Sequence, residues 1–133
     1  IEVPNLKAAD VRLYAVLKSQ QWRVATDPLT FAIGQDVSGQ PVVANLAKMP
    51  HLLIAGQTGS GKSVMINSML VSLLYRNSPS NLKLILVDPK RVEMEPYQDI
   101  PHLLTPVIND PDKAISALKW AVNEMERRYT LFG

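Results

Sequence analysis

Cysteine is absent from this sequence of 133 residues, which excludes both a disulfide framework and a metal site built on thiolates. Histidine is scarce: His51 and His102 stand far apart and lack metal-site spacing, so we interpret both as structural. No apolar run approaches the ~20 residues that a membrane-spanning helix requires, and no signal peptide is visible.

An excess of charge of one sign is also missing. The net charge is only +2, which gives weak support for nucleic-acid binding. A hydrophobic content of 47% and a charged content of 20% are typical of one globular domain or a piece of a larger one. Because the chain starts at Ile1 without a methionine and stops at Gly133 straight after a predicted helix, we expect an excised segment of a longer protein.

One segment, Gly56–Ser63, reads GQTGSGKS and matches in full the phosphate-binding pattern G-x-x-x-x-G-K-[ST]. A polyphosphate needs several converging backbone N–H groups, and the small residues let the chain curl tightly enough to supply them. Lys62 is the candidate catalytic residue and provides charge for the β- and γ-phosphates, while Ser63 provides a hydroxyl for Mg²⁺. The candidate cofactor-binding residues are Gly56, Gln57, Thr58, Gly59, Ser60, Gly61, Lys62 and Ser63.

The flanks of this loop have the expected context. His51–Ala55 is a short apolar run and predicts a buried parallel strand. Val64–Tyr75 predicts a helix whose N-terminal dipole points at the anion. Its apolar residues at helical spacing are Ile66, Met69, Leu70, Leu73 and Leu74. The alternative is a flexible Gly/Ser turn without a ligand, which would not need the Lys-Ser pair at the helix start.

The residues before the loop predict a helix followed by a hairpin. Lys7–Ser19 predicts an amphipathic helix, and Asp27-Pro28 predicts a turn. The apolar face expected for this helix consists of Val11, Tyr14, Ala15 and Leu17. Leu29–Ile33 and Pro41–Ala44 predict two short strands joined by a loop over residues 34–40.

Ser78–Asn81 ends the helix that follows the phosphate loop. The next residues predict a second buried strand at Leu82–Val87 and a short strand at Pro106–Ile108. The last helix begins with Asp110 as N-cap and Pro111 at the first position. We expect ordinary core packing for its apolar stripe, Ile115, Leu118, Val122, Met125, Tyr129 and Phe132. We expect solvent on the side that carries Lys119, Glu124, Glu126, Arg127 and Arg128. Strands that alternate with helices predict an α/β sheet covered by helices.

Asp88 ends the apolar strand LILVD, which is where a P-loop ATPase places the acidic residue that binds the hydration shell of the magnesium ion. Only 26 residues separate it from Lys62 (88 − 62), and Pro89 and Lys90 follow it where a catalytic glutamate would stand. A role in lining the site or capping the sheet is the preferred interpretation. Lys90 and Arg91 come next and either approach a nucleotide, a neighbouring subunit or DNA, or are solvated loop charges.

Three segments together resemble the motor region of the FtsK/SpoIIIE family of bacterial DNA translocases: Pro28–Ser63, Leu84–Met94 and Ile100–Phe132. They contain MPHLLIAG, DPK, IPHLLTPV and ALKWAVNEMERRY, and with the IEVPN start the resemblance covers nearly the whole chain. The resemblance implies an α/β fold that is a partial RecA-like P-loop NTPase domain, with a mostly parallel sheet flanked by helices and with an N-terminal helix and β-hairpin. Residues 1–27 would be a lead-in segment and helix, and residues 28–133 the N-terminal part of the ATPase domain.

By this resemblance the cofactors are ATP and Mg²⁺, and the intact protein is a homo-hexamer that pumps double-stranded DNA in chromosome partition, cell division or sporulation. The family carries its Walker B acids, its DNA-contacting loops and a DNA-reading module further downstream, and the membrane anchor of many members upstream. We therefore expect these 133 residues to be inactive by themselves, and the intact protein to work at the cytoplasmic face of the cell membrane.

Two other interpretations stay open. A related ring ATPase of protein secretion or conjugative transfer would keep the fold and move a different cargo. A non-enzymatic structural or interaction module would keep only the fold, and tight stoichiometric binding of ATP and Mg²⁺ would count against it.

Overall fold

The computed structural model describes residues 10–133. The chain divides into two compact units, and the boundary in the sequence lies between Asn77 and Ser78. The first unit contains a short pair of helices, a β-hairpin and a long helix, and the second contains two extended segments and the last helix. The lead-in Ile1–Asn5 and the start of the first predicted helix lie outside the described residues. The domain boundary predicted between residues 27 and 28 stays a prediction.

The first helix is shorter than predicted. Helix α1 covers Leu13–Leu17 and α2 covers Gln20–Val24. Ser19 separates them because its hydroxyl donates to the carbonyl of Val16 and accepts from the N–H of Trp22, which caps α2. The predicted apolar face is also wrong: Val16 is the buried residue of α1, whereas Tyr14 is 66% exposed.

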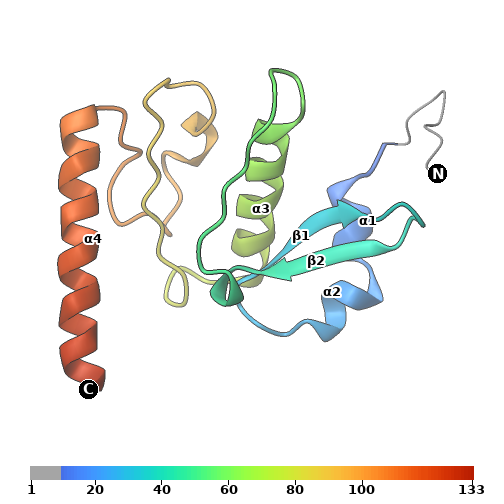
Figure 1. Ribbon diagram of the computed structural model, residues 1–133, viewed down its shortest axis with the longest axis horizontal. Helices are drawn as coiled ribbons and strands as arrows, with labels where there is room; N and C mark the ends of the chain where they lie inside the picture. The colour runs from blue at the N-terminus through green and yellow to red at the C-terminus, as the bar shows by residue number, and fades with distance from the viewer. Residues whose placement is uncertain (1–9) are drawn as a thin grey trace. The chain divides into compact units, whose positions relative to one another are not determined.

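The predicted hairpin is confirmed. Strands β1 (Thr30–Gln35) and β2 (Pro41–Asn45) pair antiparallel (Figure 1). The pairing has a bulge between Ala32 and Gly34. The carboxylate of Asp36 accepts the N–H groups of Ser38 and Gln40 and so closes the connecting turn. A 3₁₀ turn, η1 (Leu46–Lys48), follows β2.

Helix α3 covers Lys62–Arg76 and begins two residues before the predicted start. Its buried side chains are Leu70, Ser72 and Leu73, and it packs on β1, where Phe31 is fully buried. The hydroxyl of Ser72 accepts the N–H of Ala32 at 3.1 Å, which satisfies a backbone group on the edge of β1 that faces the helix. The core of this unit therefore lies between the hairpin and α3.

The strand predicted at His51–Ala55 is wrong: this segment has no regular secondary structure, and Leu53 is 89% exposed. A strand exists only where a neighbour completes its hydrogen-bond ladder, and no segment among residues 10–133 pairs with this one. Apolar content identified a segment suited to a strand but did not supply its partner.

The second unit brings the two other predicted strands together as extended segments. Leu84 and Val87 form isolated parallel bridges to Leu103 and Ile108, and the N–H of Leu84 donates to the carbonyl of His102 at 2.8 Å. The 3₁₀ turn η2 (Glu95–Tyr97) lies between them in sequence. The α/β class is confirmed. The mostly parallel sheet stays a prediction, because the one regular sheet of the described residues is the antiparallel hairpin.

Helix α4 covers Pro111–Phe132, and its predicted start is confirmed: the carboxylate of Asp110 accepts the N–H groups of Asp112 and Lys113. The core packing predicted for its apolar stripe is wrong, because the exposed fractions run from 50% at Val122 to 87% at Phe132. A helix of 22 residues is about 33 Å long. The extended segments of this unit share a pocket with the side of α4 that carries Ala117 and Trp120, and the stripe is left uncovered.

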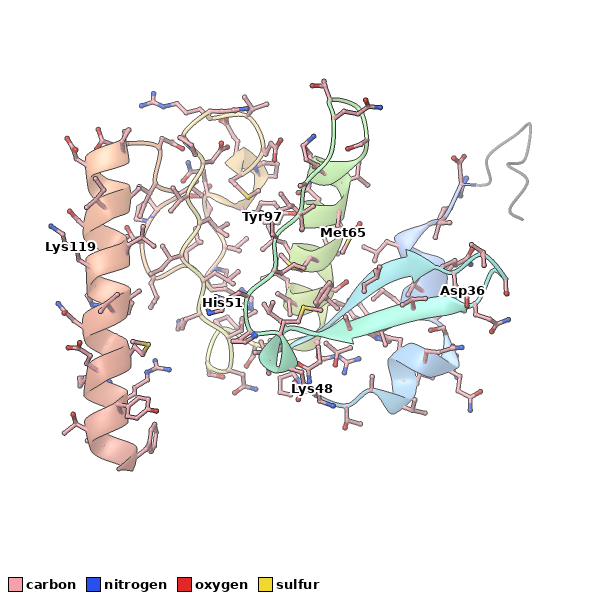
Figure 2. All side chains as sticks on the ribbon, viewed as in Figure 1. Asp36, Lys48, His51, Met65, Tyr97 and Lys119 are labelled. Atoms are coloured by element: carbon pink, nitrogen blue, oxygen red, sulfur yellow. The ribbon has the colours of Figure 1, made fainter. Side chains whose placement is uncertain are left out.

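The polar side of α4 faces solvent as predicted for Lys119, Glu126, Arg127 and Arg128, and Figure 2 shows Lys119 projecting outward from the helix. Glu124 is half-buried between two guanidinium groups, each 2.7 Å from its carboxylate. Hydrogen bonds from Arg127 and then Arg128 lower the pKa of Glu124 from 4.5 to about 2. Within residues 10–133, no helix has the length and apolar character to cross a membrane.

Candidate functional site

The loop residues Gly56–Gly61 form an exposed turn that leads directly into α3. Gly59 and Gly61 take left-handed backbone angles, with φ of 82° and 93°, which side chains with a Cβ rarely adopt. The N–H of Ser60 donates to the carbonyl of Gln57 at 3.1 Å and closes the turn. The structure thus gives the glycines of the motif the conformation that they were predicted to need.

Gly56 serves a different purpose, because its neighbour leaves no room for a side chain. A Cβ at this position would overlap the hydroxyl of Ser60 and lie 3.2 Å from its Cβ. Gly56, at the start of the turn, therefore lies close against the side chain of Ser60, near its end. This close approach is what concentrates backbone N–H groups around a single anion.

Lys62 lies at the junction of loop and helix. Its ammonium donates to the carbonyls of Gly56 at 2.6 Å and Gln57 at 2.8 Å. An ammonium has three donors, so one is left for a phosphate oxygen beside the turn. The lysine both fastens the loop and places a positive charge at its mouth.

The start of α3 is suited to an anion. Its N-cap is Gly61, which offers no side-chain acceptor, and its first turn has no acidic residue. In α4, by contrast, the carboxylate of Asp110 occupies the corresponding N–H groups. The first turn and the helix dipole of α3 fit a phosphate chain, and the half-buried Ser63 in that turn carries the hydroxyl that fits a magnesium ion.

Asp88 is a capping residue. Its carboxylate accepts backbone N–H groups from Lys90, Val92, Glu93 and Met94 at 2.9–3.2 Å, and the residue is 7% exposed. The bond from Met94 is the largest cause that lowers the pKa of this carboxyl. The capping role that the sequence favoured over the magnesium role is therefore what the geometry supports.

The remaining candidates lie in exposed or scattered positions. Lys90 and Arg91 are exposed in the loop that Asp88 caps, and Arg91 has a left-handed φ of 55°. His51 is exposed and His102 is 9% exposed. The part of the chain that the structure describes contains no cluster of three histidine or acidic residues suited to a metal ion.

Sequence reasoning missed the residues that fix α3 in place. The guanidinium of Arg76 donates to the carbonyls of Trp22, Ala25 and Asp27 and stacks on the Trp22 ring, 3.9 Å from its centre. Burial lowers the pKa of Arg76, which stays a cation. The amide of Asn77 donates to the carbonyl of Pro28 at 2.8 Å. The sequence does show a polar Arg-Asn pair at the end of an apolar helix. It does not show the hydrogen-bond partners of this pair, which lie 49–54 residues earlier in the chain.

Comparison with known proteins identifies the family to which the chain belongs. The model of the FtsK/SpoIIIE family matches residues 12–133. A protein of Clostridium tetani named DNA translocase FtsK is 58% identical over 132 residues, which is 99% of this chain and 18% of that protein.

Two further relatives agree. DNA translocase SftA of Bacillus subtilis is 58% identical over 99% of this chain and 14% of its own length. DNA translocase FtsK of Haemophilus influenzae is 57% identical over 98% of this chain and 25% of its own length. The chain thus spans between 14% and 25% of the length of these relatives.

Proposed function

The chain belongs to the FtsK/SpoIIIE family, and from this membership we propose that it is the nucleotide-binding part of an ATP-driven motor that translocates double-stranded DNA. The observation that carries the proposal is the GQTGSGKS turn at the start of α3, with the Lys62 ammonium held by the carbonyls of Gly56 and Gln57. The names of three relatives, all DNA translocases, favour DNA over a polypeptide as the cargo.

Each residue of the site has a distinct role in this proposal. Backbone N–H groups of Gly56–Gly61 and of the first turn of α3 bind the phosphate oxygens of ATP. Lys62 compensates the charge that develops on the β- and γ-phosphates, and Ser63 holds the magnesium ion. A magnesium ion held at Ser63 would supply positive charge that offsets the negative charge of the transferred phosphoryl group.

Several finer points belong to the same proposal and rest on family membership. They are the mostly parallel RecA-like sheet, the homo-hexameric ring, and the work in chromosome partition, cell division or sporulation. The site at the cytoplasmic face of the cell membrane is proposed on the same ground. The parallel bridges from Leu84 and Val87 are consistent with two neighbouring strands of such a sheet.

The test is the ATPase activity of the intact protein in the presence of duplex DNA. We expect Lys62→Ala to lower this activity at least about 100-fold, since one lost electrostatic contact to the transition state costs about that much. Lys119→Ala is the matched control, because Lys119 is an exposed lysine on the polar side of α4 (Figure 2). Unchanged ATPase activity in Lys62→Ala would contradict the proposal. An ATPase activity of the unmodified protein that does not rise when duplex DNA is added would contradict it as well.

A further inference from the structure

The exposed apolar stripe of α4 repeats like one strand of a coiled coil. Its six residues follow one another at alternating steps of four and three, which is the spacing of the a and d positions of a heptad. Their exposed fractions run from 50% to 87%. The a positions are Ile115, Val122 and Tyr129, and the d positions are Leu118, Met125 and Phe132. A helix with this pattern presents its stripe to another helix.

The second unit meets α4 on the other side of the helix. Ala117 and Trp120 of α4 line a pocket together with Ile85 and Ile108 of the extended segments. In the heptad these two α4 residues take positions c and f, which lie across the helix axis from a and d. The stripe is therefore free to bind a partner while α4 keeps its contacts within its own unit.

Two copies of the stripe would together bury the area of a small specific interface. Covering an apolar side chain of this size removes roughly 100 Å² of its surface from water, so six residues from each copy remove roughly 1,200 Å². This area lies at the low end of the range for specific protein interfaces. A second copy of the stripe is therefore large enough to be a partner, and the dimer that it forms should be weak.

The charged residues beside the stripe favour one orientation of the two helices. Lys119 and Glu126 take e positions on one flank, and within residues 10–133 neither makes an ion pair. If the helices are antiparallel with all six layers filled, Lys119 of each copy faces Glu126 of the other, and Arg128 faces Ala121. Parallel helices would place Lys119 opposite Ala114 and Glu126 opposite Ala121, with no ion pair. Charge complementarity therefore selects the antiparallel arrangement.

We propose that the stripe of α4 binds the same stripe of a second copy of this chain, with the two helices antiparallel. Lys119 of each copy pairs with Glu126 of the other. A contact of this kind has two-fold symmetry and cannot by itself generate a six-membered ring, so it goes beyond the homo-hexamer proposed above. It also stands apart from the proposed function, because its residues take no part in the chemistry at Gly56–Ser63.

The first experiment is sedimentation equilibrium of the full chain from low micromolar to near-millimolar concentration. We expect a monomer–dimer equilibrium with a dissociation constant in the micromolar range, because the buried area is small. Leu118→Glu places two carboxylates inside the contact and should weaken the dimer at least about tenfold. The matched control is Leu131→Glu on the same helix but outside the stripe, since Leu118 is 66% exposed and Leu131 65%. This control should leave the dissociation constant unchanged.

The second experiment reverses charges at low ionic strength, where exposed ion pairs are screened least. Lys119→Glu alone and Glu126→Lys alone each place like charges at both contacts, so each should weaken the dimer about tenfold. The double variant Lys119→Glu/Glu126→Lys restores both pairs with their signs exchanged and keeps the net charge of the chain. It should therefore regain the dissociation constant of the unmodified protein.

A chain that stays monomeric at the highest concentration would overturn the inference, because the stripe would then be covered by a different protein or by another part of a longer chain. A dimer that Leu118→Glu leaves intact would place the contact elsewhere and overturn it as well. Equal dissociation constants for the two single charge variants and the double variant would exclude the antiparallel pairing, and the inference with it. Circular dichroism verifies the helicity of each variant, and if Leu118→Glu is not helical the charge variants, which keep the stripe, decide the matter.

Discussion

Ser72→Ala tests the contact that holds the helix of the phosphate loop against the hairpin. Ser72 has no exposed surface; its hydroxyl accepts the N–H of Ala32 at 3.1 Å and donates to the carbonyl of Ser68 at 2.6 Å. Alanine leaves the Ala32 N–H buried without that acceptor, which costs ~1–3 kcal/mol. We therefore expect the free energy of unfolding to fall by about 2 kcal/mol.

The matched control is Ser116→Ala on α4. The hydroxyl of Ser116 also donates to the carbonyl four residues earlier, that of Asp112, at 3.0 Å, but it is exposed and water replaces the lost bond. We expect a change within ~0.5 kcal/mol for this variant. The comparison thus isolates the buried bond to Ala32 from the general effect of a serine-to-alanine change within a helix.

The assay is equilibrium unfolding in urea. Ser72→Ala is followed by the fluorescence of Trp22 in a Trp120→Phe background, which reports the first unit, and Ser116→Ala by the fluorescence of Trp120 in a Trp22→Phe background, which reports the second. With a slope of ~1–3 kcal/mol per molar urea, the midpoint of Ser72→Ala should fall by about 1 M at constant slope. Equal shifts of the midpoint for Ser72→Ala and Ser116→Ala, each measured against its own background, would refute the reasoning, because the Ser72 hydroxyl would then not be satisfying a buried N–H.

Three further changes have defined outcomes. Arg76→Lys cannot reproduce the guanidinium fork to three carbonyls, so the urea midpoint of the first unit should fall by the equivalent of ~1–3 kcal/mol; an unchanged midpoint would show that the fork contributes nothing. Asp110→Ala removes the N-cap of α4 and should cost ~1 kcal/mol, whereas Asp110→Ser, which keeps a capping oxygen, should cost less. Since the pKa of Glu124 is lowered from 4.5 to about 2, its ion pairs stabilise α4 above pH 4.5 and are lost as the pH falls toward 2. Helicity by circular dichroism should follow that loss, and Glu124→Gln should abolish this pH dependence; an identical titration in both proteins would refute it.

Local signals were sufficient for the elements whose stability is local. The capping pair Asp110-Pro111 fixed the start of α4, and the turn residues between the two short strands fixed the hairpin. The tight curl predicted for the glycines of the phosphate loop is local for the same reason, since Gly59 and Gly61 reach left-handed φ angles that other residues rarely adopt.

What could not be predicted depends on partners. His51–Ala55 is as apolar as a buried strand, yet without a neighbouring strand in the described residues it forms none. The stripe of α4 has perfect helical spacing, yet spacing states which residues share a face and not what covers that face. Ser72 and Arg76 were missed for the same reason, since their partners are set by tertiary packing.

Helix α3 is attached to the rest of the first unit mainly at its C-terminal end, so it can transmit movement from its N-terminal end. Arg76 and Asn77 tie its far end to residues 22–28, whereas at its near end Lys62 bonds only back to the loop carbonyls of Gly56 and Gln57. Helix α3, with 15 residues and a length of about 22 Å, thus connects the phosphate turn to the attachment points at Ser72 and Arg76. A displacement of the turn across the helix axis would be passed by α3 to residues 22–28. Amide hydrogen exchange in that segment should therefore change when a ligand displaces the turn.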